Sequence, residues 1–239
     1  INALCCAINM RTVMEARALW KVYQTGDNLV QAVRGVDLKL KQGEMVAIMG
    51  RSGCGKTTLL NVLSGIDEPS SGEVLVGEKQ LFGISDDERT EMRAQNFGFV
   101  FQSFNLLPVL SAVENVELPL LLIGKSSTEA RDGAIKALTS VGLEDRANHR
   151  PTELSGGQQQ RVAIARAIVH SPSVILCDEP TGNLDSATSS EVMQLLRQIN
   201  IENNSMLLLV THDDKIAKQC DRILKMDDGI IIADTSEEE

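Results

Sequence analysis

The chain of 239 residues is long enough for one large α/β domain or for two small ones. Hydrophobic residues make up 43% of it, which is ordinary for a globular protein and enough to bury a core. The formal net charge of −10 argues against nucleic acid as a partner, because binding phosphate backbones requires a basic surface. The sequence contains no run of the roughly 18–20 apolar residues that cross a bilayer. Its five scattered cysteines are typical of reduced thiols rather than of a disulfide framework.

The first part of the chain predicts strands followed by a helix. Residues 12–40 alternate apolar and polar side chains in short pieces, the period of strands with one solvated face. Glu44–Met49 is a compact apolar run, which indicates a strand buried on both faces. After a glycine-rich turn, Lys56–Gly65 is expected to be a helix. Ile1–Asn9 has no basic region of the kind that begins a signal peptide, and we treat residues 1–11 as a leader of uncertain origin.

The middle of the chain is predicted to be mainly helical. Ser85–Glu88 and Ser126–Glu129 have the spacing of a helix capping box. Between them, Phe97–Phe101 is a short apolar run that predicts a strand.

The last third returns to alternating strands and helices. Ser173–Cys177 and Met206–Val210 are expected to be strands, and apolar residues recur at helical spacing between them, at Val192, Leu195, Leu196 and Ile199. Such alternation predicts an α/β fold with a mainly parallel sheet.

We therefore expect a single domain over residues 12–238. Residues 12–84 and 160–235 would form the α/β core, together with an N-terminal antiparallel β subdomain. Residues 85–159 would form an inserted, mainly helical subdomain.

A glycine-rich loop stands between the buried strand and the first helix. Gly50–Thr57 matches the pattern G-x-x-x-x-G-K-[ST] of phosphate-binding loops, and its position after a strand and before a helix is the one that the mechanism requires. Glycines let the backbone amides fold around phosphates, Lys56 would reach the β- and γ-phosphates, and Thr57 would bind Mg²⁺. The alternative is a glycine-rich turn that matches by chance. The nucleotide-binding residues expected here are Gly50, Ser52, Gly53, Cys54, Gly55, Lys56, Thr57 and Thr58.

Two carboxylates end the predicted strand Ser173–Cys177. Asp178 would hold Mg²⁺, directly or through water, and Glu179 would orient and deprotonate an attacking water. Two acids in this position are also common in a solvated turn. Together with the phosphate loop, however, they indicate a P-loop NTPase that uses ATP and Mg²⁺.

Leu154–Gln158, with the sequence LSGGQ, narrows the class. Ser155 and Gln158 have capping-box spacing, so one interpretation is simply a well-capped helix. However, the segment resembles the signature motif of the ABC ATPase family. The resemblance extends over about Ala16–Asp234 and includes the order of the motifs: phosphate loop, Val100–Gln102, signature, acidic strand end, Asn183–Asp185 and Thr211–Asp213.

The resemblance implies roles for further residues. Gln102 resembles the glutamine that senses the γ-phosphate and metal and couples to the membrane partner. His212 resembles the histidine that steadies the γ-phosphate and attacking water, although a lone histidine is more often an ordinary surface residue. Tyr23 is placed like the aromatic residue on which adenine stacks, with a structural tyrosine at the sheet edge as the alternative.

The resemblance also implies a homodimer with two composite ATP sites. The signature residues Ser155, Gly156, Gly157 and Gln158 would contact the ATP held by the partner's phosphate loop, and Asp185 would contact the second subunit.

Asp178–Asp185 and Pro108–Pro119 resemble the branch that serves lipoprotein release and macrolide or peptide efflux. Import of a small polar solute is the rival. Either function implies membrane permease subunits and a peripheral location on the cytoplasmic face of the cell membrane. We expect Gln102–Asn115 to be the docking surface for the permease.

Three other classes fit less well. DNA-repair ATPases of this family insert a long coiled coil between the phosphate loop and the signature, and this chain has no sustained heptads there. Ribosomal members usually carry two ATPase units and basic linkers. A regulatory, non-hydrolysing module would not need both Glu179 and His212.

Overall fold

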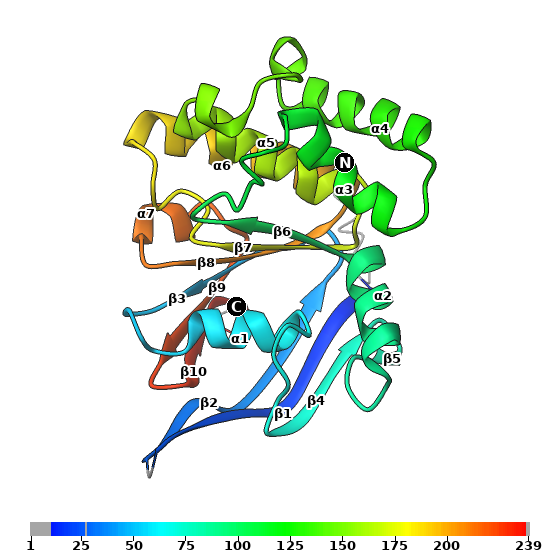
Figure 1. Ribbon diagram of the computed structural model, residues 1–239. Coiled ribbons are helices and arrows are strands. Elements are labelled where there is room, and N and C mark those ends of the chain that lie inside the picture. Colours follow the sequence, from blue (N-terminus) through cyan, green and yellow to red (C-terminus); the bar gives the residue numbers. More distant parts are fainter. Residues whose placement is uncertain (1–10, 27, 238–239) are drawn as a thin grey trace, which may run out of the picture.

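The computed structural model describes residues 11–26 and 28–237, so residues 1–10 of the predicted leader lie outside the described part. Its strands form two sheets, one four-stranded in the order β2-β1-β4-β5 and one six-stranded in the order β10-β9-β3-β8-β7-β6 (Figure 1). The first sheet consists of β1 (Thr12–Thr25), β2 (Asn28–Lys41), β4 (Ser71–Val76) and β5 (Lys79–Gln80). The second consists of β3 (Met45–Met49), β6 (Phe97–Phe101), β7 (Val174–Asp178), β8 (Met206–Thr211), β9 (Arg222–Asp227) and β10 (Ile230–Asp234).

The pairing confirms the predicted α/β fold. In the six-stranded sheet β3, β6, β7, β8 and β9 run parallel, and β10 is antiparallel to β9. The N-terminal sheet is antiparallel. The predicted single domain, with its division into core and inserted helical part, stays a prediction. The boundary between residues 159 and 160 falls inside a helix.

The helices lie in two layers. Helices α3 to α6 cover one face of the six-stranded sheet, and α1 lies between the two sheets (Figure 1). The helices are α1 (Lys56–Leu63), α2 (Asp86–Asn96), α3 (Ala112–Leu122), α4 (Ser127–Ser140), α5 (Gly156–Ile168), α6 (Ser186–Asn203) and α7 (Asp214–Ala217), with short 3₁₀ turns η1 (Glu144–Arg146), η2 (Pro151–Glu153) and η3 (Thr235–Glu237).

Strand β3 is apolar along its whole length because both of its faces are buried. Met45 and Ala47 belong to the core formed with α3–α6, whereas Val46 and Ile48 belong to the core formed with α1 and the antiparallel sheet. Because successive side chains of a strand point to opposite faces, a sheet covered on both faces needs apolar residues at every position.

Serine caps set the starts of several helices. The predicted capping boxes at Ser85, Ser126 and Ser155 are confirmed. In each, the serine hydroxyl accepts a hydrogen bond from the backbone N–H three residues later, and the side chain of that later residue accepts one from the serine N–H. Ser111 caps α3 in the same way, which we did not predict. The described cysteines Cys54, Cys177 and Cys220 are free thiols, and Cys5 and Cys6 lie outside the described residues.

Candidate functional site

The glycine-rich loop borders a cavity of about 710 Å³ at the carboxyl ends of the parallel strands. The loop leaves β3, and α1 begins at Lys56 with Gly55 as its N-cap. Gly55 has φ +102°, and a Cβ there would lie 2.1 Å from the carbonyl oxygen of Ala32. Only glycine fits this close approach to β2. The predicted residues that line the cavity are Tyr23, Ser52, Gly53, Cys54, Gly55, Lys56, Thr57, Thr58, Gln102, Glu179 and His212.

Lys56 is almost fully buried beneath the loop. Its Nζ donates hydrogen bonds to the carbonyl oxygens of Gly50 (2.8 Å) and Arg51 (2.9 Å). A buried ammonium group requires such partners, because burying an unpaired charge is costly. These bonds hold the cation at the centre of the loop, beside the first amides of α1, where an anion would be attracted by the helix N-terminus.

The carboxylate of Asp178 meets the first turn of α1. The Thr57 hydroxyl donates a hydrogen bond of 3.2 Å to Asp178 Oδ1. Burial raises the pKa of Asp178, the neighbouring Glu179 raises it further, and the Thr57 bond and Lys56 oppose the shift. A cation at this point would favour the ionised carboxylate.

Glu179 and His212 form a second pair at the ends of adjacent strands. His212 Nδ1 lies 2.8 Å from Glu179 Oε1. Glu179 has φ +49°, a conformation that is uncommon outside glycine. Its N–H donates to the carbonyl oxygen of Val210 on β8, and this bond fixes the turn. The carboxylate is largely covered, whereas the imidazole is mostly exposed at the cavity mouth.

Gln102, directly after β6, is held by the loop that follows Glu179. Its Nε2 donates to Asn183 Oδ1, and Asn183 Nδ2 donates back to the carbonyl oxygen of Gln102, both at 3.0 Å. Gly182 packs so closely on Gln102 that a Cβ there would lie 2.7 Å from Nε2. Gln102 and Glu179 are therefore connected through a single short loop.

Tyr23 also lines the cavity, and neighbouring residues hold both its hydroxyl and its ring. Its hydroxyl donates a 2.5 Å hydrogen bond to Asp67 Oδ2, and Lys21 Nζ lies 2.6 Å from Asp67 Oδ1. The same ammonium group is 4.8 Å from the centre of the Tyr23 ring. Burial and then the Asp67 bond raise the pKa of Tyr23. The rest of the ring borders the cavity.

The signature residues and Asp185 do not line this cavity. Ser155 caps α5, accepting from the Gln158 N–H at 3.3 Å, and Asp185 caps α6, accepting from the Ala187 and Thr188 N–H groups at 3.0 Å. A Cβ at Gly157 would lie 2.5 Å from Thr188 Cγ2, so the two helix starts lie against one another.

Sequence reasoning missed the partners that hold the site residues. Asp67 is 44 positions from Tyr23, and only the fold brings the two together. Asn183 stands in a recognised motif, but its spacing gave no reason to pair it with Gln102.

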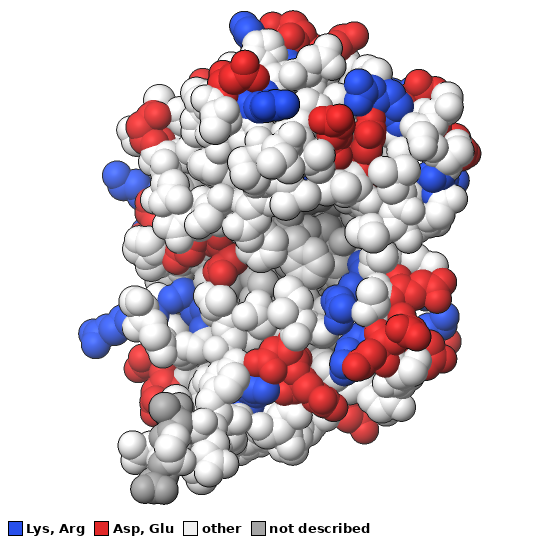
Figure 2. Space-filling view, in the orientation of Figure 1, with Lys and Arg blue, Asp and Glu red and all other residues white. Residues whose placement is uncertain are grey.

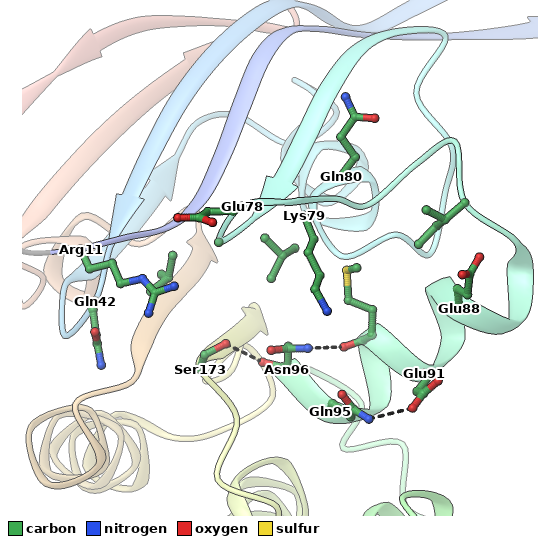
Figure 3. A pocket seen from close by; sticks show the side chains of 15 residues that line it. Arg11, Gln42, Glu78, Lys79, Gln80, Glu88, Glu91, Gln95, Asn96 and Ser173 are labelled. Atoms are coloured by element: carbon green, nitrogen blue, oxygen red, sulfur yellow. Dashed lines mark hydrogen bonds between the residues drawn. The ribbon is translucent and has the colours of Figure 1, made fainter.

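A larger cavity, of about 980 Å³, lies at the other end of the parallel strands (Figure 3). Gln42 and Ser173, which precede β3 and β7, line it, and the side chains of Arg11 and Lys79 extend into it. It contains none of the predicted site residues. Size therefore does not identify the functional site, and the chemistry points to the smaller cavity.

The comparisons with known proteins agree with this geometry. The profile of the ABC transporter family matches residues 33–182. The chain is 45% identical over 221 residues to the lipoprotein-releasing system ATP-binding protein LolD of Legionella pneumophila (strain Paris), covering 92% of this chain and 97% of LolD. This chain belongs to the ABC transporter family. It is an ATP-binding, ATP-hydrolysing subunit with the fold of an ABC cassette.

Other relatives of the ABC family support the assignment. Macrolide export ATP-binding/permease protein MacB of Rhodopseudomonas palustris (strain BisB18) is 44% identical over 94% of this chain, which spans 34% of MacB. The dimeric structure of the ABC transporter cassette MJ0796 matches with a TM-score of 0.85 and 44% identity, covering 92% of this chain and 97% of that one. MJ0796 has also been solved as a dimer in a post-hydrolysis state with ADP and Pi.

Proposed function

We propose that this ABC ATPase energises a membrane permease of the lipoprotein-release or macrolide-export branch. The similarity to LolD over nearly the whole of both chains is the observation that supports this branch. The rival is import of a small polar solute. Another solved relative, cbiO1 from Clostridium perfringens, part of the ABC transporter complex cbiONQ, is 32% identical.

ATP would bind with its phosphates on the glycine-rich loop and its base against Tyr23. The backbone amides of the loop and the start of α1 supply partial positive charge, and Lys56 supplies a full charge. The clamp by Asp67 and Lys21 fixes the ring of Tyr23 before the base arrives, which reduces the entropy lost on binding.

Thr57, Asp178 and Gln102 would hold Mg²⁺. A hydroxyl, a carboxylate and an amide oxygen are the hard oxygen ligands that this ion prefers, and Mg²⁺ needs few protein ligands when phosphates complete its shell. The described residues contain no group of three or more His, Cys, Asp or Glu side chains placed to hold a metal ion by themselves. Bound there, Mg²⁺ would neutralise charge on the β- and γ-phosphates.

Glu179 would act as the general base in hydrolysis. It accepts a proton from water while the water oxygen forms a bond to the γ-phosphorus, and the bond from that phosphorus to the β–γ bridging oxygen breaks, leaving ADP and phosphate. His212, bonded to Glu179, is placed to orient the γ-phosphate and water.

Two copies would be needed for a complete site. Ser155 and Gly157 lie outside the cavity of their own subunit, and the signature of one subunit would close on the ATP of the other, with Asp185 at the contact. The relative MJ0796 has been solved as a dimer.

The permease would dock on the face beside Gln102. A groove of about 360 Å³ lies between α2, β6, α3 and α5, with Phe97, Phe99 and Leu122 among its lining residues. Figure 2 shows the corresponding hollow as largely free of charged side chains. Nearby Leu107 and Val109 are 46% and 75% exposed, which suits contact with an apolar partner helix.

Docking there would hold the chain at the cytoplasmic face of the membrane as a peripheral subunit. Among the residues that the structure describes, no helix is long and apolar enough to span a bilayer.

Affinity capture of the tagged chain from its native membranes, with identification of the co-purifying permease, tests the branch. We expect a permease with few spans and a large extracytoplasmic domain. A many-span permease that works with a solute-binding protein would contradict the branch while leaving the ATPase intact.

A further inference from the structure

The turn that follows Gln102 has two consecutive left-handed residues, a conformation that asparagine tolerates but that phenylalanine rarely adopts. Phe104 and Asn105 are consecutive and have φ values of +61° and +49°. Neither is glycine, and a left-handed pair of this kind persists only where surrounding contacts stabilise it. The backbone bonds of the turn itself are the Phe104 N–H to the Phe101 carbonyl oxygen (3.1 Å) and the Asn105 N–H to the Ser103 carbonyl oxygen (2.6 Å).

Arg166 of α5 forms further hydrogen bonds to this turn. Its Nη2 donates to the carbonyl oxygen of Phe104 at 2.8 Å, and its Nη1 donates to that of Asn105 at 2.5 Å. The guanidinium is mostly buried, and burial lowers the pKa of Arg166. Within the described part of the chain, its hydrogen bonds all go to these two carbonyl groups. A buried cation with no carboxylate partner is costly unless those bonds are formed, so the guanidinium and the turn depend on each other.

The same turn also contacts the other end of α5. The ring of Phe104 lies against Gly156, the first residue of the helix, where a Cβ would be 3.8 Å from Phe104 Cζ. Two residues earlier, Gln102 is bonded to Asn183 in the loop after Glu179. The turn therefore joins the helix that carries the signature to the loop that carries the candidate general base.

We propose that Arg166 is a positioning residue that fixes the Phe104–Asn105 turn and thereby places Gln102 relative to α5. The inference rests on the proposed role of Gln102 at the γ-phosphate. A role confined to stabilising α5 would leave turnover per folded molecule unchanged. A positioning role predicts that loss of the two bonds impairs hydrolysis more than nucleotide binding.

Steady-state ATP hydrolysis by the purified chain tests the proposal. In Arg166→Met, we expect kcat to fall ~10–100-fold, the scale expected for a misplaced catalytic group, with KM for ATP within ~3-fold. Arg166→Lys keeps the charge and one donor, and we expect its kcat to lie between Arg166→Met and wild type. Arg161→Met is the matched control on the same helix, because Arg161 pairs with Glu191 away from the turn, and its kcat should match wild type.

A second-site variant separates positioning from simple helix stability. Glycine adopts positive φ without strain, so Asn105→Gly added to Arg166→Met should recover kcat by roughly fivefold or more. Unchanged kcat in both Arg166 variants, or no recovery with Asn105→Gly, would overturn the proposal. If Arg166→Met does not fold, as judged by circular dichroism, Arg166→Lys decides alone: a wild-type kcat would overturn it.

A parallel Gln102→Ala variant distinguishes the two levels of inference. If Gln102→Ala hydrolyses ATP like wild type, the proposed role of Gln102 fails. If Gln102→Ala is impaired and the Arg166 variants are not, the positioning role alone is wrong.

Discussion

At the scale of single residues, the residues of the candidate site differ in whether the sequence could predict them. The charged groups Lys56, Asp178 and Glu179 could be read from the sequence because their chemistry requires them at fixed distances from a strand or a helix. The residues that hold Tyr23 could not be predicted in this way. Lys21 and Asp67 stand in segments with no functional pattern, and only folding brings them behind Tyr23.

Tyr23 offers a test of the base-stacking role with a matched pair of variants. Tyr23→Ala should weaken ATP binding by the ~1–3 kcal/mol typical of an aromatic–base stack. Tyr23→Phe keeps the ring and loses only the bond to Asp67, so its affinity should fall much less. Titration with a fluorescent ATP analogue measures both. Equal affinities for the alanine variant and wild type would return Tyr23 to a structural role at the sheet edge.

At the scale of elements, the caps and the buried strands followed from local rules. In the predicted capping boxes, each serine and the residue three positions later exchange hydrogen bonds. Both faces of the central sheet are covered, as its continuously apolar strands require, so the local pattern and the tertiary packing agree. The Phe104–Asn105 turn could not be predicted, because the side chain that bonds its carbonyl groups, Arg166, is 62 positions away from Phe104.

Two helices with the same cap allow structure and function to be separated. Ser126→Ala and Ser155→Ala each remove a capping box and should each lower the free energy of unfolding by ~0.5–2 kcal/mol. Only Ser155 is proposed to contact ATP, so kcat should fall in Ser155→Ala and stay at the wild-type level in Ser126→Ala. Denaturant unfolding and ATPase assays on both variants give the comparison. Equal activity of the two would contradict the signature assignment.

At the scale of the whole molecule, an ion pair joins the last two strands of the six-stranded sheet. Arg222 on β9 donates to Asp234 on β10 at 2.8 and 2.5 Å, and also to the carbonyl oxygen of Lys39 at the end of β2. These contacts tie the last strand to the first sheet. The sequence shows an acidic C-terminal segment, but it does not indicate which of its carboxylates is paired.

This pair predicts a pH dependence of stability. Arg222 is the main cause that holds the pKa of Asp234 at about 2, below its ordinary value of 3.8. A lowered folded-state pKa stabilises the fold above the ordinary value, and that stability is lost as pH falls towards 2. Asp234→Asn should therefore cost about 1–2 kcal/mol of unfolding free energy at pH 7, allowing for solvent screening, and the cost should shrink below pH 4. The exposed Asp145→Asn is the control, and a pH-independent cost at Asp234 would contradict the ion-pair account.

The most direct test of the central claim is sedimentation of Glu179→Gln with and without ATP, alongside its rate of ATP hydrolysis. The site geometry predicts that the variant binds ATP, fails to hydrolyse it and accumulates as an ATP-bound dimer, because the base is removed while the phosphate loop and signature remain. Hydrolysis at the wild-type rate would contradict the general-base assignment. A monomer that stays monomeric with bound ATP would contradict the composite site.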